Sequence, residues 1–234
     1  MAHISDLHNK DFQGKLIEKI RKLNPEIIVI TGDLIDRRNT NIEAAEKFMR
    51  EVVKVAPTYY VSGNHEQLSG LYTTLKRKLE VLNVNIMDNS YAVIEKKGGR
   101  IGLLGLADPA VHQSEESYLW DDGSRYVEAE LKNLLDGIDT KFNILLSHRP
   151  ELFELYSDLQ IDLVFSGHAH GGQIRLPFIG GLIAPNQGLF PQYTAGVYSS
   201  GATSMVVSRG LGNSIFPVRV FNRPELVVVT LKKA

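Results

Sequence analysis

The sequence of 234 residues predicts an α/β fold, in which short buried strands alternate with amphipathic helices. Over the first ninety residues, apolar runs of strand length alternate with segments whose apolar residues fall at helical spacing. Five times along the chain, a short apolar run ends in Ser or Thr, and potential metal ligands follow within a few residues. Because ligands bind at the carboxyl edge of the strands in an open α/β sheet, these side chains are expected to share one site.

The first half of the chain reads as successive strand–helix–strand units. The predicted strands are 2–5, 27–30, 58–61 and 84–87, and the predicted helices between them are 16–23, 44–53 and 68–82. Asn24-Pro25 and Ala56-Pro57 end the first two helices, since the residue before a proline disfavours the helical conformation. This alternation is what a parallel sheet requires.

The second half is richer in β-structure. Tyr91–Glu95 and Ile101–Leu106 flank Lys97-Gly98-Gly99-Arg100, which predicts a β-hairpin. A polar segment over 108–125 is long enough for a functional loop. The remaining predicted elements are a helix over 127–135 and strands at 144–147, 163–166 and 226–231. We find no linker and expect residues 1–234 to form a single catalytic domain.

Composition excludes several classes of protein. A formal net charge of −1 gives no general attraction to polyanions, so no stable nucleic-acid partner is expected. The absence of cysteine excludes disulfides and thiolate metal sites, so any metal must be held by nitrogen and oxygen. No apolar run approaches ~18 residues, and the chain as given is expected to be soluble. Because Asp6 follows Met1 so closely, we expect the natural protein to carry a further N-terminal anchor or export signal, with the compartment unassigned.

Seven side chains at the predicted strand ends are candidate metal ligands. They are Asp6, His8, Asp33, Asn64, His148, His168 and His170. This mixture of carboxylate, imidazole and amide suits Mn, Fe or Zn, and seven ligands exceed the needs of one tetrahedral ion. Two ions ~3.5–4 Å apart activate water and stabilise both the attacking and the leaving oxygen of a phosphoryl displacement. The pattern therefore predicts two divalent ions and hydrolysis of phosphate esters.

The same residues carry a resemblance to a known family. Five segments resemble, in order and spacing, the motifs of the calcineurin-like metallophosphoesterases. They are Asp6-Leu7-His8, Gly32-Asp33-Leu34-Ile35-Asp36-Arg37, Gly63-Asn64-His65-Glu66, His148 and Gly167-His168-Ala169-His170. The resemblance implies a four-layer αββα sandwich of two mixed sheets flanked by helices. It also implies that Asp6, His8, Asp33 and His170 hold one ion and that Asp33, Asn64, His148 and His168 hold the other, with Asp33 as the bridge.

The resemblance also assigns roles around the metals. It implies that His65 is catalytic, facing the phosphate as general acid or as electrostatic partner of the transition state. Glu66 and Asp36 are expected to orient neighbouring imidazoles or loops. Arg149 is a candidate for binding substrate phosphate, with an ordinary salt bridge as the alternative, and Arg175 is a second candidate.

The Gly- and Pro-rich segment 171–201 admits two interpretations. Its apolar residues, Phe178 and Phe190 among them, either pack as an irregular hairpin on the second sheet or form an apolar wall beside the metals. The segment resembles a bacterial, membrane-associated subfamily of these phosphoesterases, some of whose members cleave the pyrophosphate of UDP-2,3-diacylglucosamine. That resemblance implies a lipid-linked or nucleotide-containing substrate and peripheral membrane association as alternatives.

The function predicted is hydrolysis of phosphodiester or pyrophosphate bonds by attack of metal-bound hydroxide. One alternative is a UDP-2,3-diacylglucosamine pyrophosphatase-like hydrolase of a lipid precursor. A second is a non-catalytic interaction module on the same scaffold, which the presence of every expected ligand and of His65 disfavours. A third is a dinuclear hydrolase that cleaves C–N or C–O bonds of another type.

Overall fold

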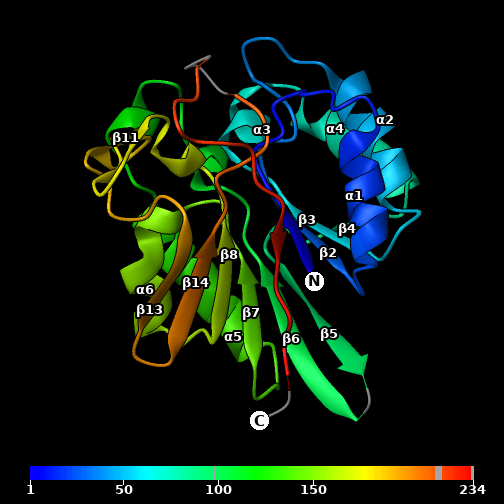
Figure 1. The fold of residues 1–234 in the computed structure, drawn as a ribbon. Helices are drawn as coiled ribbons and strands as arrows, with labels where there is room; N and C mark the ends of the chain where they lie inside the picture. The colour runs from blue at the N-terminus through cyan, green and yellow to red at the C-terminus, as the bar shows by residue number, and fades with distance from the viewer. Residues whose placement is uncertain (97, 214–217, 233–234) are drawn as a thin grey trace.

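The computed structural model describes residues 1–96, 98–213 and 218–232, in which two β-sheets pack together between helices (Figure 1). The first sheet has the strand order β15-β1-β2-β3-β4. Its strands are β1 (Ala2–Ile4), β2 (Ile28–Thr31), β3 (Thr58–Val61), β4 (Asn85–Ile86) and β15 (Val227–Val228). β1 to β4 are parallel, and β15 lies antiparallel beside β1, so the sheet is mixed.

Helices connect the parallel strands of the first sheet, as predicted. They are α1 (Lys15–Leu23), α2 (Ile42–Val52), α3 (Asn64–Leu68) and α4 (Tyr72–Val81). The helix predicted over 68–82 is wrong at its start, because the chain turns at Gly70, whose φ of +69° is incompatible with a continuous helix. The predicted strand at 226–231 is shorter, since only Val227–Val228 pairs with β1.

The second sheet has the strand order β13-β14-β8-β7-β6-β5. Its strands are β5 (Ser90–Lys96), β6 (Gly99–Gly105), β7 (Asn143–Leu146), β8 (Leu163–Ser166), β13 (Gly196–Ser200) and β14 (Thr203–Val207). The four central strands are parallel, and β5 and β13 are antiparallel edges. The predicted hairpin of β5 and β6 is confirmed, although Lys97 in its turn lies outside the described residues.

Helices also cover the outer face of the second sheet. They are α5 (Ser124–Asp136) and α6 (Phe153–Asp158), accompanied by the short helices η1 (Pro109–His112), η2 (Ser117–Leu119), η3 (Pro150–Leu152) and η4 (His170–Gly172). In the described residues, no helix combines the length and the apolar character needed to cross a bilayer.

The side chains of the central strands alternate between two buried faces. Ile28 and Ile30 pack against the helices of the first sheet, whereas Val29 points into the layer between the two sheets. Likewise Leu146 lies between the sheets, and Leu145 packs beneath α5 and α6. Three successive apolar layers therefore separate helices, sheet, sheet and helices, which confirms the predicted four-layer αββα sandwich.

Segment 171–201 forms two small hairpins before it joins the second sheet. They are built from β9 (Arg175–Leu176) with β10 (Gly180–Gly181), and from β11 (Ile183–Ala184) with β12 (Gly188–Leu189). Phe178 is fully exposed and Phe190 is 70% exposed, so the expectation that the apolar residues of this segment are packed is wrong for these two. Tyr193, by contrast, is buried against Phe153.

The interface between the two sheets predicts a large effect for Phe165→Ala. Phe165 is fully buried there, so its truncation is expected to lower the free energy of unfolding by ~3–5 kcal/mol. Urea denaturation measures the change, with Val81→Ala on exposed α4 as a control that should shift stability by less than ~0.5 kcal/mol. Equal midpoints for the two variants would contradict the packing of the sheets through this layer.

Candidate metal centre

The seven predicted ligands meet where the carboxyl edges of the two sheets face each other. Asp6 and His8 follow β1, Asp33 follows β2, and Asn64 follows β3. From the second sheet, His148 follows β7, while His168 and His170 follow β8. All seven side chains are buried. The structure therefore brings together residues from five strand ends that are separated by up to 164 positions in the sequence.

The first group of ligand atoms consists of side chains from Asp6, His8, Asp33 and His170. Nε2 of His170 lies 3.4 Å from Oδ1 of Asp6, and Nε2 of His8 lies 3.5 Å from Oδ2 of Asp33. The two imidazoles approach each other with 3.1 Å between their Nε2 atoms. These donor atoms converge on a common centre.

The second group consists of Asp33, His148 and His168, with Asn64 beside them. Nε2 of His148 lies 3.2 Å from Oδ2 of Asp33, 3.2 Å from Oδ1 of Asn64 and 3.1 Å from Nδ1 of His168. Nδ1 of His148 is 2.6 Å from the carbonyl of Thr31, so it donates its proton there and leaves Nε2 available as a ligand.

Asp33 belongs to both groups through a single oxygen. Its Oδ2 faces His8 on one side and His148 on the other, whereas its Oδ1 accepts the backbone N–H of His65 at 2.9 Å. A carboxylate held in this way is oriented to share Oδ2 between two cations.

The donor set and its spacing fit two divalent ions. Ligands at about 2.1 Å from an ion lie about 3.0–3.4 Å from one another in tetrahedral or octahedral geometry. The close pairs of donor atoms within the two groups are 3.1 to 3.5 Å apart, and all donor atoms of each group identified as a possible metal site lie within 4.8 Å of one another. Facing imidazole nitrogens repel unless a cation or proton lies between them, and a divalent ion satisfies all of them at once. The mixture of nitrogen and oxygen donors suits Mn, Fe or Zn, and the geometry does not distinguish among them.

The ligands are held in a strained backbone. Asp6, His8, Asp33, His168 and His170 all have φ between +46° and +64°, a region that residues other than glycine seldom adopt. Clustering of such residues is typical of functional sites, where the surrounding structure enforces the conformation.

Two motif glycines are required for close packing. A Cβ on Gly63 would lie 2.2 Å from Oδ1 of Asp33, and a Cβ on Gly167 would lie 2.5 Å from Oδ2 of Asp6. Neither glycine has a positive φ. The motifs therefore need glycine here so that backbone can pass directly behind a ligand carboxylate.

Glu66 connects the loops that follow β2 and β3. Its carboxylate accepts backbone N–H groups from Asp33 at 2.7 Å, Gly63 at 2.8 Å and Ile35 at 3.1 Å. Burial, with the nearby Asp33 carboxylate, raises the pKa of Glu66 to about 7. Asp36 lies 3.6 Å from Nδ1 of His8, and its interaction with that ring lowers the pKa of the Asp36 carboxyl. Both contacts agree with the expected orienting roles.

Electrostatics around Asp33 favour positive charge on His148, whereas burial holds the pKa of His168 and of His170 well below the usual range. Burial alone would raise the pKa of the Asp33 carboxyl, but His148 and His65 beside it hold that pKa well below its usual range. Burial opposes a charge on His148, yet the Asp33 carboxylate raises the pKa of His148 to about 10. A field that stabilises a proton on a buried imidazole also stabilises a metal cation at the same position.

His65 lies beside the first ligand group with a defined tautomer. Its Nδ1 accepts the backbone N–H of Arg37 at 3.0 Å, so in the neutral ring the proton is on Nε2. Burial lowers the pKa of His65 to about 4, which keeps the ring neutral near pH 7. Its ring packs edge-on against His8, with 4.4 Å between centroids. His65 is thus oriented as a hydrogen-bond donor next to the centre.

The two predicted substrate-binding arginines have protein partners. Arg149 is completely buried, and Asp108 accepts from both its Nε and its Nη2. Arg175 donates to the carbonyl of Gly171 at 2.9 Å and to the hydroxyl of Thr194 at 3.2 Å. The Arg149 guanidinium thus binds carboxylate side chains, whereas Arg175 binds a backbone carbonyl next to His170. The contact of either arginine with substrate stays a prediction.

Sequence reasoning missed several residues that support the ligands. Oδ1 of Asn186 lies 2.9 Å from Nε2 of His168, and Nδ2 of Asn222 lies 2.6 Å from the carbonyl of His170. The backbone N–H of Gly212 donates to the carbonyl of Asp6 at 2.6 Å. Only Gly210-Leu211-Gly212 offered a signal, because a Gly-x-Gly shortly after an apolar run indicates close backbone approach.

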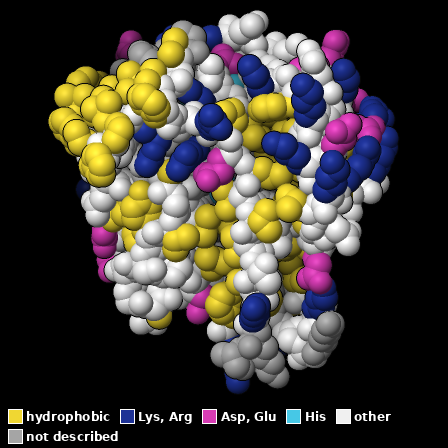
Figure 2. Space-filling view, viewed as in Figure 1, with side chains coloured by type: hydrophobic (Ala, Val, Ile, Leu, Met, Phe, Trp, Pro, Cys, Tyr) yellow, Lys and Arg dark blue, Asp and Glu magenta, His cyan; other side chains and the backbone are white. Residues whose placement is uncertain are grey.

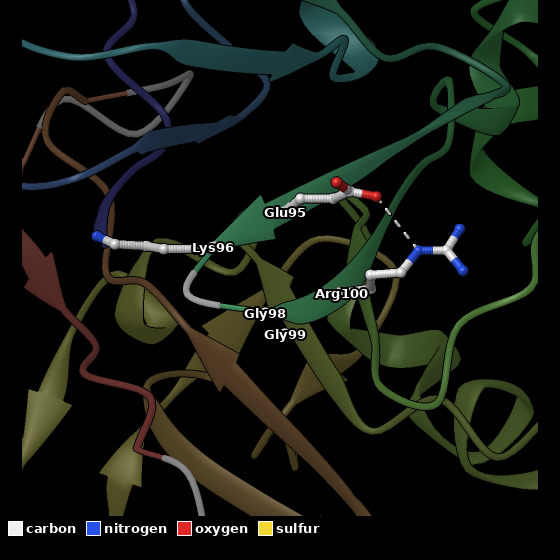
Figure 3. Close-up of a pocket in the computed structure, with 5 residues that line it drawn as sticks. All are labelled: Glu95, Lys96, Gly98, Gly99 and Arg100. Carbon is white, nitrogen blue, oxygen red and sulfur yellow. Dashed lines mark ion pairs between the residues drawn. The ribbon is translucent and has the colours of Figure 1, made fainter.

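A surface hollow at the turn of the β5–β6 hairpin is unrelated to this centre. It is lined by Glu95, Lys96, Gly98, Gly99 and Arg100 (Figure 3). Glu95 and Arg100 lie 3.5 Å apart on one side of the hairpin, and Lys96 points to the other. Because β6 begins here, the hollow lies at the amino edge of the sheet, opposite the ligands that follow β7 and β8.

Comparison with known proteins agrees with this arrangement. Residues 1–172 match the family described as calcineurin-like phosphoesterase, which covers most of the chain and all seven ligands. The chain belongs to the calcineurin-like phosphoesterase family. It is therefore a metal-dependent phosphoric ester hydrolase, and the family implies a centre of two divalent ions at the two groups that share Asp33.

Relatives extend the match beyond residue 172. The metallophosphoesterase YkuE of Bacillus subtilis is 32% identical over 99% of this chain and 76% of its own length. The metallophosphoesterase Cj0846 of Campylobacter jejuni is 32% identical over 98% of this chain, which spans only 58% of that protein. The phosphodiesterase YaeI of Escherichia coli is 27% identical over 88% of this chain and 70% of its own length.

Solved structures share the fold. TT1561 of Thermus thermophilus superposes with a TM-score of 0.60 at 15% identity, covering 89% of this chain and 88% of that one. The phosphopantetheinyl hydrolase PptH of Mycobacterium tuberculosis superposes with a TM-score of 0.56 at 13% identity, covering 88% and 87%. At these identities the likeness shows the fold alone.

The position of Asp33 predicts that both ions depend on it. Protein loaded with Mn is expected to approach two ions per chain, and Asp33→Asn should reduce the occupancy of both, because an amide supplies neither the negative charge nor a shared anionic oxygen. Elemental analysis after gel filtration measures the content. Asp11→Asn, a change in an exposed carboxylate, is the control and should keep both ions. One tightly held ion surviving in Asp33→Asn would contradict the bridge.

The contact of Asn186 with His168 predicts a selective effect on one ion. Asn186→Ala should weaken the ion held by His148 and His168 by ~10–100-fold, because His168 loses the acceptor that fixes its ring. Asn186→Asp keeps an acceptor and should retain affinity. Calorimetric titration of the metal-free protein resolves the two binding events. Equal weakening of both ions, or equal loss in both variants, would show that Asn186 acts only on the local fold.

Proposed function

We propose that this protein hydrolyses phosphodiester or pyrophosphate bonds, with Mn, Fe or Zn as its two ions. The single observation that carries the proposal is the sharing of the Asp33 Oδ2 atom between two buried ligand groups, with a neutral His65 beside them. Two ions bound there would supply hydroxide near neutral pH and would stabilise negative charge on the phosphoryl oxygens. The remaining chemistry depends on the side chains of the chain itself.

The role assigned to His65 is to donate a hydrogen bond to the phosphoryl group of the substrate. The Arg37 N–H occupies its Nδ1, so Nε2 carries the proton that is donated. The ring is neutral near pH 7, which suits a hydrogen bond to a phosphoryl or leaving oxygen better than transfer of a full proton. Its backbone N–H meanwhile holds Oδ1 of Asp33, so one residue orients both the bridging carboxylate and the substrate.

Two of the arginines near the centre are paired with carboxylates, which favours a substrate with about one negative charge on each phosphorus, whereas Arg219 lies 3.3 Å from Nδ1 of His170. Arg37 pairs with Glu115 at 3.1 Å, and Arg149 is neutralised by Asp108. A monoester dianion would benefit from additional positive charge, whereas a diester or an internal pyrophosphate linkage carries about one charge on each phosphorus and needs less. The 27% identity to the phosphodiesterase YaeI supports the same choice.

A lipid-linked pyrophosphate is a second candidate substrate, and one observation favours it. Segment 171–201 exposes Phe178, Leu189 and Phe190, and Asn186 of the same segment contacts the ligand His168. If the pyrophosphate of such a molecule binds at the metal centre, its acyl chains can lie along the apolar surface of this segment. UDP-2,3-diacylglucosamine compared with UDP-N-acetylglucosamine tests this candidate, which requires kcat/KM to favour the acylated compound by at least ~10-fold.

The proposed reaction is tested with a panel of esters on Mn-loaded protein. Bis-nitrophenyl phosphate, nitrophenyl phosphate and a nucleotide pyrophosphate represent the three bond types, and Asp33→Asn is the inactive control. A higher kcat/KM for the diester or the pyrophosphate than for the monoester is expected. A marked preference for the monoester would overturn the proposal and leave phosphatase activity as the function. Hydrolysis of amides or carboxylic esters alone would identify a different dinuclear hydrolase.

The assignment of the His65 Nε2–H as a hydrogen-bond donor predicts how kcat changes when this donor is removed. His65→Ala should lower kcat for diester hydrolysis by ~10²–10³, the usual effect of losing one positioned donor. His65→Gln, whose amide N–H can reach a similar position, should recover part of the loss. Metal content and unfolding midpoint should be unchanged in both. A loss that grows sharply with the pKa of the leaving group, without rescue by Gln, would indicate proton transfer instead.

A further inference from the structure

An exposed group of apolar side chains, here called the apolar tip, projects from the two small hairpins. It consists of Leu176, Phe178, Ile179, Ile183, Leu189 and Phe190. Phe178 is fully exposed, and Leu189, Phe190 and Ile179 are 72%, 70% and 60% exposed. Figure 2 shows hydrophobic side chains gathered at this corner of the molecule, with Lys and Arg side chains directly beside them. Contiguous exposed apolar surface of this kind marks a contact with a partner or a membrane.

The backbone holds the apolar tip outward. Phe178 and Phe190 have φ of +68° and +56°, values that bulky residues rarely adopt and that glycine would accept without strain. The hairpins are tied to each other, because the N–H of Phe190 donates to the carbonyl of Leu182 at 2.9 Å. The N–H of Leu182 in turn lies 2.9 Å from the carbonyl of Ile174. The aromatic side chains are thus presented on fixed turns.

The segment that carries the apolar tip has only positive formal charges. Between Gly171 and Pro224 the chain has four arginines and no Asp or Glu, so all 27 acidic residues of the protein lie outside this range. Arg175 directly precedes the apolar tip, and burial, together with the nearby Arg209, lowers the pKa of Arg175. Arg209 itself lies 4.0 Å from Glu225, which follows this range. Arg223 is exposed. The chain as a whole has a net charge of −1, but the stretch from Gly171 to Pro224 carries only positive formal charges. This stretch therefore attracts anions more than the whole molecule does.

We propose that the apolar tip inserts into the interface of an anionic lipid bilayer, with the neighbouring arginines at the level of the phosphate headgroups. Aliphatic and Phe side chains on protruding turns suit the boundary between headgroups and acyl chains, and a basic rim is attracted to anionic lipid. Because Asn186 lies between β11 and β12 and contacts His168, docking would bring the metal centre near the lipid surface. The proposal concerns binding and holds independently of which ester is cleaved.

Vesicle sedimentation tests the proposal with the full chain. Vesicles of phosphatidylcholine with phosphatidylglycerol are compared with vesicles of phosphatidylcholine alone, at low and at high salt. Binding is expected on the anionic vesicles, weakened by salt, and Phe178→Ser/Phe190→Ser should reduce it by at least ~10-fold. Val81→Ser is the matched control, because Val81 is an equally exposed apolar residue on α4, and it should bind like the parent protein.

Two results would overturn the proposal. The first is that the parent protein and the double variant bind vesicles equally well, or that neither binds any vesicle. The second is a concentration-dependent dimer that the double variant abolishes while vesicles remain unbound, which would assign the apolar tip to contact between two copies of the chain. Unfolding midpoints of all variants are measured alongside, and a large loss in the double variant would show that these side chains support the fold. Because no ester is present, neither result bears on the hydrolysis proposed above.

Discussion

The approach of the Asp33 carboxylate to imidazoles from both sheets is the interaction on which the rest of the structure depends. Burying Asp6 and Asp33 together is costly unless positive charge lies between them, and the histidines that follow β7 and β8 bring nitrogen ligands but no permanent charge. Two divalent ions resolve this imbalance. The carboxyl edges of the sheets are therefore expected to be held together by the ions as well as by the apolar layer beneath them.

Several local features follow from bringing so many ligands to one place. Five ligands adopt a positive φ, and Gly63 and Gly167 allow backbone to pass behind carboxylates where a Cβ would collide. The buried Glu66 accepts three backbone N–H groups and so joins two ligand-bearing loops without contacting the ligand atoms itself. These features raise the energy of the folded chain locally, and the three apolar layers of the sandwich compensate for them.

The fold and the convergence of the seven candidate ligands were predictable because both depend on short-range patterns. Strand runs, helical spacing and the residues immediately after each strand are visible in the sequence, and parallel strands necessarily place their carboxyl ends together. The break at Gly70 was missed because regularly spaced leucines such as Leu75 and Leu79 outweighed one glycine in the pattern. Asn186 and Asn222 were missed because their partners lie 18 and 52 residues away, and no local spacing identifies a polar residue that supports a ligand from another segment.

The last quarter of the chain contacts the candidate ligands, although the family match ends at residue 172. Gly212 binds the carbonyl of Asp6, Asn222 binds the carbonyl of His170, and Asn186 fixes the ring of His168. These contacts reach candidate ligands in both groups, so the region after residue 172 completes the support that the five motifs begin. Within this region, the stretch from Gly171 to Pro224 carries the apolar tip and four arginines and has no acidic residue, and Glu225 follows it. Asn186 therefore joins the segment that carries the apolar tip to the candidate ligand His168, so that the proposed binding to lipid and the support of the metal centre would depend on the same segment.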